Sequence, residues 1–222
     1  VLFRSFAFSG CESMTEIVIP NTVTQIGEHA FDGCSGVRSV IIPYGITNIA
    51  WNAFLSCSGV LDATVPGYMF GMDLQNVTNI VIPQGTTNIA NNAFSEAKQL
   101  LNVLIPDSVI SIGRNAFSEC SSLTELIIPS GVDHIGNCAF MGCEGLRAFS
   151  VSIDNPSFSS IDGLLLSKDG KTVVCGVNGR VSIPQGVTTI ADSAFWGYRG
   201  LVSVAIPSTV SSIGSRAFRD CS

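Results

Sequence analysis

The sequence predicts a repeat solenoid that is mainly β, built from short strands joined by short helical or 3-10 turns. Two residue types recur with a period of 23 residues along the 222-residue chain. Prolines lie at positions 20, 43, 66, 83, 106, 129, 184 and 207, and the phenylalanine of an Ala-Phe pair lies at 8, 31, 54, 94, 117, 140, 195 and 218. Because both series keep one register, they define a single repeating unit, and a period of this length is typical of a solenoid.

Residues 100–129 form one regular copy, and each part of it predicts one element. The aliphatic run at 103–105 predicts a strand that ends at Pro106, because proline cannot donate to a strand ladder. A second short apolar run at 109–112 is followed by a glycine, and the Ala-Phe pair at 116–117 predicts a single helical turn or a short helix. One copy cannot bury its own apolar face, so we expect the copies to stack with parallel strands and a spine of phenylalanines.

The first departure from the regular unit is a short repeat at 66–82. It is six residues shorter than the others and lacks both the Ala-Phe pair and the cysteine. We expect the missing residues to remove the turn on the convex side and to leave a notch. Met69 and Met72 occupy the inward positions of this repeat, and methionine suits an irregular gap because it is flexible and unbranched.

The second departure is an inserted segment at about 152–183. Apolar runs flank the Lys-Asp-Gly-Lys sequence at 168–171, a pattern that predicts a hairpin with an Asp-Gly turn. We favour a packed elaboration of the solenoid over a dedicated binding loop. Residues 1–222 are therefore expected to form a single solenoid domain, and because the chain begins and ends within a repeat, we expect both ends to be cuts through a longer protein.

Six of the eight cysteines occupy one slot of the repeat, three residues after the phenylalanine. They are Cys11, Cys34, Cys57, Cys120, Cys143 and Cys221, while Ala97 and Tyr198 fill the slot elsewhere and Cys138 and Cys175 lie outside it. A slot that accepts alanine is a small-residue packing site, which favours buried free thiols. Disulfides between neighbouring coils, about 5 Å apart, are the alternative, although their geometry is exacting.

The repeated string L-x-x-[V/L]-x-I-P-x-x-V-x-x-I-G-x-x-A-F-x-x-C resembles the leucine-rich repeat of the BspA-like, or Treponema-type, family. The resemblance extends through all the Ala-Phe units and so covers essentially the whole chain. It implies a curved, right-handed leucine-rich-repeat coil whose strands form a parallel sheet on the concave face. It also implies a bacterial cell-surface or secreted protein, because several members of this family are adhesins that bind host matrix proteins or other bacteria.

Composition and motifs argue against several classes of protein. The net charge of −6 argues against a nucleic-acid partner, which needs a basic stripe. Prolines and polar residues interrupt every apolar run before it reaches the length of about 18 residues that spans a membrane. The two histidines, His29 and His134, occupy different slots of non-adjacent repeats, and we expect both at the surface. We therefore predict no enzyme activity and no catalytic, cofactor-binding or metal site.

The strand pattern predicts which side chains are exposed. If the residues three and one before each proline face the core, those four and two before it face the concave side. We predict a concave binding surface formed by Val18, Ile41, Asp62, Val81, Asn102, Leu104, Glu125 and Ile127. An exposed aliphatic stripe beside an acidic one is typical of an interaction site. The alternative is that aliphatic residues stand there only because of their β propensity.

These observations lead to two hypotheses of function. The first is a non-enzymatic protein-binding module of a surface or secreted leucine-rich-repeat protein, which acts in adhesion through its concave sheet. Its partner would be a protein with basic residues, either a host extracellular-matrix protein or another bacterial surface protein, and the module would be a monomer that does not insert into a membrane. The second hypothesis is a passive spacer that displays another domain.

Overall fold

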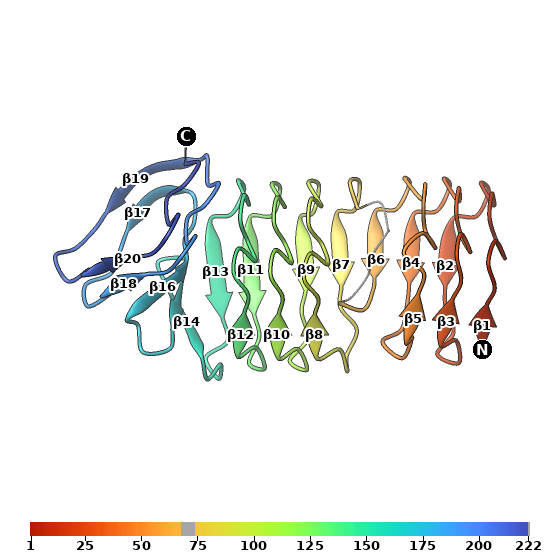
Figure 1. Cartoon of the computed structure of the whole chain (residues 1–222), viewed down its shortest axis with the longest axis horizontal. Helices are drawn as coiled ribbons and strands as arrows, with labels where there is room; N and C mark the ends of the chain where they lie inside the picture. Colours follow the sequence, from red (N-terminus) through yellow and green to blue (C-terminus); the bar gives the residue numbers. More distant parts are fainter. Residues whose placement is uncertain (68–73, 222) are drawn as a thin grey trace.

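The computed structural model describes residues 1–67 and 74–221, and it confirms the predicted repeat solenoid. Most coils contribute one longer strand and one two-residue strand, which lie on opposite sides of a continuous apolar core. Figure 1 shows the coils from β1 to β13 side by side along the long axis, with β14 to β20 at the C-terminal end. Because each coil repeats the same apolar pattern, most strands pair in register with a strand of the next coil.

Nine longer strands form one side of the solenoid. They are β2 (Glu16–Val18), β4 (Ser39–Ile41), β6 (Asp62–Thr64), β7 (Asn79–Val81), β9 (Asn102–Leu104), β11 (Glu125–Ile128), β13 (Ala148–Val151), β17 (Gly179–Ser182) and β19 (Leu201–Ala205). Hydrogen bonding joins them in parallel as β2-β4-β6-β7-β9, β11-β13 and β17-β19. We call the solvent side of β2 to β11 the long-strand face, and it corresponds to the concave face of the sequence prediction.

The two-residue strands form the other side. They are β1 (Leu2–Phe3), β3 (Gln25–Ile26), β5 (Asn48–Ile49), β8 (Asn88–Ile89), β10 (Ser111–Ile112), β12 (His134–Ile135), β18 (Thr189–Ile190) and β20 (Ser212–Ile213). They pair in parallel as β1-β3-β5, β8-β10-β12 and β18-β20. Only their second residues turn toward the core, so this side is short and mostly polar.

The turn that contains each Ala-Phe pair differs in detail from the short helix of the prediction. In the coil of Phe117, the residue's N–H donates to the carbonyl of Ala139 in the next coil at 2.8 Å, while the N–H of Ser118 bonds within its own coil. Asn115 and Glu119 have φ angles of 54° and 61°. Left-handed residues cannot continue a right-handed helix. The segment is therefore a series of single turns whose alternate N–H groups bond to the neighbouring coil.

The phenylalanines of these turns stack as predicted, but not along the whole array. Neighbouring rings lie 5.1 Å apart for Phe31 and Phe54 and 5.3 Å apart for Phe94 and Phe117, measured between centroids. All four side chains are almost completely buried. Burial of a phenylalanine side chain stabilises the fold by roughly 1.5–3 kcal/mol. The stack is the main apolar contribution of the turns to the core.

The short repeat affects the two sides of the solenoid differently. On the long-strand side, β6 and β7 pair directly, so the sheet continues through this repeat without interruption. On the other side, the described residues form two separate sheets, which end at β5 and begin again at β8. The carbonyl of Gly67 accepts a hydrogen bond from the N–H of Ala90, next to β8. Met69 and Met72, which the sequence places in the gap, lie outside the described residues.

The inserted segment folds as an antiparallel meander of β14 (Phe158–Ile161), β15 (Leu164–Ser167) and β16 (Thr172–Cys175). The side chains of β15 from Leu164 to Leu166 are completely buried, so the segment packs on the solenoid. β16 then pairs in parallel with β18 and takes the place of a two-residue strand. The hydrogen bonds between the turns of neighbouring coils continue across the insertion: the N–H of Gly142 donates to the carbonyl of Trp196 at 3.1 Å.

Candidate functional site

The long-strand face displays an aliphatic stripe. The side chains of Val18, Ile41, Val81, Leu104 and Ile127 have exposed fractions of 57, 37, 37, 61 and 59%. From β2 to β9 the residues of this stripe are direct neighbours in the sheet register, with Thr64 between Ile41 and Val81. With strands about 4.8 Å apart, the stripe extends for roughly 24 Å across six coils. These side chains are exposed where the alternation of the strands predicts.

A polar stripe runs beside the aliphatic one, two residues earlier in each strand. The amide of Asn79 donates to Asp62 Oδ1 at 2.7 Å, and the amide of Asn102 donates to Asn79 Oδ1 at 2.8 Å. Farther along, the Ser150 hydroxyl donates to Glu125 Oε1 at 2.6 Å. The Asn79 amide donates to one coil and accepts from the next, so these bonds orient the side chains and leave Asp62 as the anionic end of the ladder.

The structure exposes all eight residues of the predicted binding surface and brings them onto one continuous face. Two features of this face were not predicted. Asn79 links Asp62 to Asn102 by hydrogen bonds, and this role becomes visible only when the register between neighbouring strands is known. Leu61 and Leu101, five residues before their prolines, are also exposed and enlarge the apolar area beside the polar stripe. Their positions lie outside the strands, where the strand alternation makes no prediction.

The cysteine slot is structural, as predicted. Cys34, Cys57, Cys120 and Cys143 are buried, and none of the eight cysteines forms a disulfide. The sequence did not reveal that each buried thiol is also a donor: Cys120 Sγ lies 3.2 Å from the carbonyl oxygen of Phe94 in an earlier coil. Burial raises the pKa of Cys120 to about 12. A neutral thiol of this kind is a poor nucleophile.

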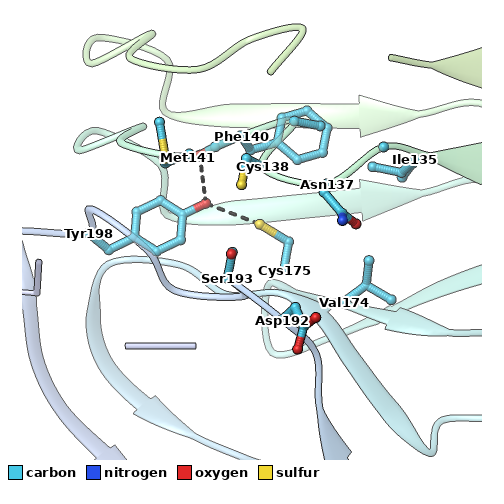
Figure 2. A pocket seen from close by; sticks show the side chains of 12 residues that line it. Ile135, Asn137, Cys138, Phe140, Met141, Val174, Cys175, Asp192, Ser193 and Tyr198 are labelled. Carbon is cyan, nitrogen blue, oxygen red and sulfur yellow. Dashed lines mark hydrogen bonds between the residues drawn. The ribbon is translucent and has the colours of Figure 1, made fainter. Parts of the chain in front are cut away.

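Where Tyr198 replaces the cysteine, its hydroxyl takes over the same hydrogen bond. The Tyr198 hydroxyl donates to the carbonyl of Phe140 at 3.2 Å, and Cys175 Sγ lies 3.1 Å from it. Figure 2 shows these groups lining a small cavity together with Cys138. The cavity volume is about 60 Å³, far below the roughly 300 Å³ of a small-molecule site. It marks the place where the array crosses the insertion and has no features of a ligand site.

The two histidines are not brought together. His134 is exposed on β12, as predicted, but His29 is half-buried and this expectation requires correction. His29 Nδ1 bonds Asp32 at 2.8 Å, its Nε2 bonds the amide of Asn52 at 2.9 Å, and its ring stacks on Phe6 at 4.9 Å. Its left-handed backbone, with φ of 53°, directs the ring against the neighbouring coils.

The described residues also lack other features that would indicate a different class of site. No three side chains among His, Cys, Asp and Glu converge as metal ligands in residues 1–67 and 74–221. Over the same ranges, no helix has the length and hydropathy that a bilayer crossing requires. The long-strand face, with its exposed aliphatic and polar stripes, is the candidate functional site.

The parallel coils, the buried phenylalanine and cysteine ladders and the exposed long-strand face define a leucine-rich-repeat solenoid. The chain belongs to the BspA-type leucine-rich-repeat family, whose model matches residues 2–69, 63–164 and 175–222 in six copies. A comparison with curated proteins gives no match.

Several solved bacterial structures are similar to the chain. A leucine-rich cell surface protein of Faecalibacterium prausnitzii has 30% identity and a TM-score of 0.68 over 98% of this chain and 61% of that protein. The pneumococcal vaccine antigen PcpA has 23% identity and a TM-score of 0.69 over 93% of this chain and 48% of that antigen. A leucine-rich-repeat protein of Bacteroides ovatus has 23% identity and a TM-score of 0.55, over 100% of this chain and 68% of that protein. The chain thus spans about three fifths and one half of the first two.

Proposed function

We propose that the chain is a non-enzymatic protein-binding module of a bacterial surface or secreted protein, and that it acts in adhesion through the long-strand face. The aliphatic stripe is the main support for this proposal. Exposed aliphatic side chains continue across neighbouring strands, and contiguous apolar patches of this kind are typical of interaction sites. The description of a similar protein as a cell surface protein supports the location.

The two stripes also define the chemistry of the partner. The aliphatic stripe requires a complementary apolar strip, while Glu16, Asp62 and Glu125 beside it favour basic residues on the partner. Opposite charges at the rim of an interface increase the association rate and set the orientation. The partner that we propose is therefore a protein with an apolar strip flanked by lysine or arginine, and extracellular-matrix proteins of the host are the first group to test.

The proposal can be tested with a double variant, Leu104→Lys with Ile127→Lys, and surface plasmon resonance on a panel of purified extracellular-matrix proteins. Both side chains point into solvent, so the melting temperature should not change. Binding of at least one matrix protein by the wild type should be lost in the variant, because the new charges would be buried at the interface. A matched pair on the other side, Thr87→Lys with Ile110→Lys, should retain binding.

The alternative is a passive spacer that displays another domain. In that case the long-strand face has no partner, and its aliphatic residues are there because β-branched and aliphatic side chains favour strands. Unaltered adhesion by the Leu104 and Ile127 variant, or the absence of binding by the wild type, would support the spacer and contradict the binding module.

A further inference from the structure

A second surface on the opposite side of the solenoid forms a polar groove of about 430 Å³ across three coils. One wall is the row Asn88, Ser111 and His134, which are in-register neighbours in β8, β10 and β12. The other wall is formed by the residues three positions later, Asn91, Arg114 and Asn137. We call this surface the amide groove. It runs along the solenoid axis, and each coil adds one polar side chain to each wall at a spacing of about 4.8 Å.

Glycine occupies the floor of the groove in two of the three coils, where the backbone of the preceding coil leaves no room for a Cβ atom. A Cβ atom added to Gly113 would lie 2.6 Å from the backbone nitrogen of Asn91, and one added to Gly136 would lie 2.5 Å from that of Arg114. The coils approach so closely here that no side chain fits. A ligand in the groove would therefore contact the floor through backbone and the walls through polar side chains.

The Ser111 hydroxyl donates to Asn88 Oδ1 on the same wall, but other donors of the two walls have no partner among the described residues. The backbone N–H of Arg114 donates to Asn91 Oδ1 at 2.7 Å, which fixes the amide of Asn91 with its NH₂ group free. Among the described residues, nothing bonds the guanidinium of Arg114 or the side chains of His134 and Asn137. No carboxylate lines the groove, although Asp133 precedes His134 in the chain. In a chain of net charge −6, this groove is a donor-rich site with a permanent positive charge.

We propose that the amide groove binds an acidic oligosaccharide, with a sugar carboxylate on Arg114 and sugar hydroxyls on the flanking asparagines. A guanidinium matches a carboxylate with two parallel hydrogen bonds, and an amide can both donate to and accept from hydroxyl groups. A peptide fits less well, because protein-binding sites depend on apolar or aromatic anchors, and the apolar side chain that lines this groove, Ile112, is completely buried. The site lies on the opposite side from the long-strand face and does not depend on the protein-binding proposal.

The test uses the intact chain and trigalacturonate as the probe, with binding followed by NMR chemical shifts. Saturable binding is expected for the wild type, and it should weaken at least about tenfold for the methyl ester of the probe and for Arg114→Gln. Arg180→Gln removes the same charge from the exposed strand β17 and should bind as the wild type does. Arg114 is exposed, so an unchanged melting temperature would show that its variant is folded.

Three results would overturn the proposal. Trigalacturonate could cause no saturable shift in the wild type, or Arg114→Gln could bind as tightly as Arg180→Gln. A triglutamate peptide that binds as tightly as trigalacturonate would show a general carboxylate site and contradict the assignment to a saccharide. The protein-binding proposal would stand in each case, because it rests on Leu104 and Ile127, which lie on the long-strand face.

Discussion

Replacement of Cys120 by alanine should change how the stability of the protein depends on pH. The thiol is completely buried, and burial raises its pKa from 9.0 to about 12. Because the pKa of the thiol is higher in the folded chain than in the unfolded chain, the neutral buried thiol contributes fully to the stability of the fold below about pH 9. This contribution is lost as the pH rises toward 12. In the unfolded chain the thiol ionises near pH 9, whereas in the folded chain it keeps its proton.

The magnitude follows from the two pKa values. Between pH 9 and 11, ionisation of the thiol stabilises the unfolded chain by about 2 kcal/mol for one cysteine. The folded chain does not share this gain, because its thiol stays protonated. At neutral pH, Cys120→Ala should be less stable than the wild type by about 1–2 kcal/mol, because the variant loses a hydrogen bond and a sulfur atom from the core. At pH 11 the wild type should have lost about 2–3 kcal/mol through ionisation of the thiol in the unfolded chain, so the difference from the alanine variant, which has no thiol, should vanish or reverse.

Urea unfolding followed by circular dichroism at pH 7, 9, 10 and 11 measures both differences. Val109→Ala is the matched control, because it also removes buried atoms from a fully buried site but introduces no change in titration. Its difference from the wild type should stay constant with pH. If the Cys120→Ala difference also stays constant, the thiol is not held neutral by burial and the reasoning fails.

Two further predictions concern the core and the backbone. Phe117→Ala should lower the free energy of unfolding, measured in urea titrations, by about 3–5 kcal/mol. Phe218→Ala should lower it by less, because the Phe218 ring is only half-buried. Equal losses for the two variants would contradict a packed stack. Gly113→Ala should destabilise the protein by about 1–3 kcal/mol, since its Cβ would lie 2.6 Å from the Asn91 nitrogen. Gly45→Ala, with open space around it, should be neutral or slightly stabilising. Thermal melts of both glycine variants measure this difference, and a similar loss of stability at both would refute the close-approach argument.

The sequence predicts the long-strand face well because a strand has a period of two. Once Pro106 marks the end of β9, the exposure of Asn102 and Leu104 follows from the alternation, and the in-register neighbours repeat it. The hydrogen-bond ladder through Asn79 could not be predicted, because it depends on the register between coils. That β-branched residues favour strands also means that exposure alone does not distinguish a binding face from a neutral one.

The turns and the insertion were predicted less completely. The Ala-Phe segment has apolar spacing that suits a helix, yet bonds to the next coil favour left-handed residues such as Asn115. In the insertion, the Asp-Gly turn indicates one hairpin, but the sequence does not reveal that β16 joins β18 in parallel. Likewise, the replacement of a cysteine by Tyr198 becomes intelligible only when its hydroxyl is seen to reach the carbonyl of Phe140. These are long-range contacts that local patterns do not encode.

The backbone hydrogen bond between Gly142 and Trp196 closes the loop that contains the insertion, and this longer loop costs little additional chain entropy. These residues are 54 positions apart, whereas Phe117 and Ala139, a regular pair of the same ladder, are 22 apart. Because the entropy of loop closure grows only with the logarithm of length, the longer loop costs about 0.8 kcal/mol more. The tip of the hairpin at 168–171, where Gly170 has open space around it, should therefore accept a grafted peptide while the coils on both sides remain stacked.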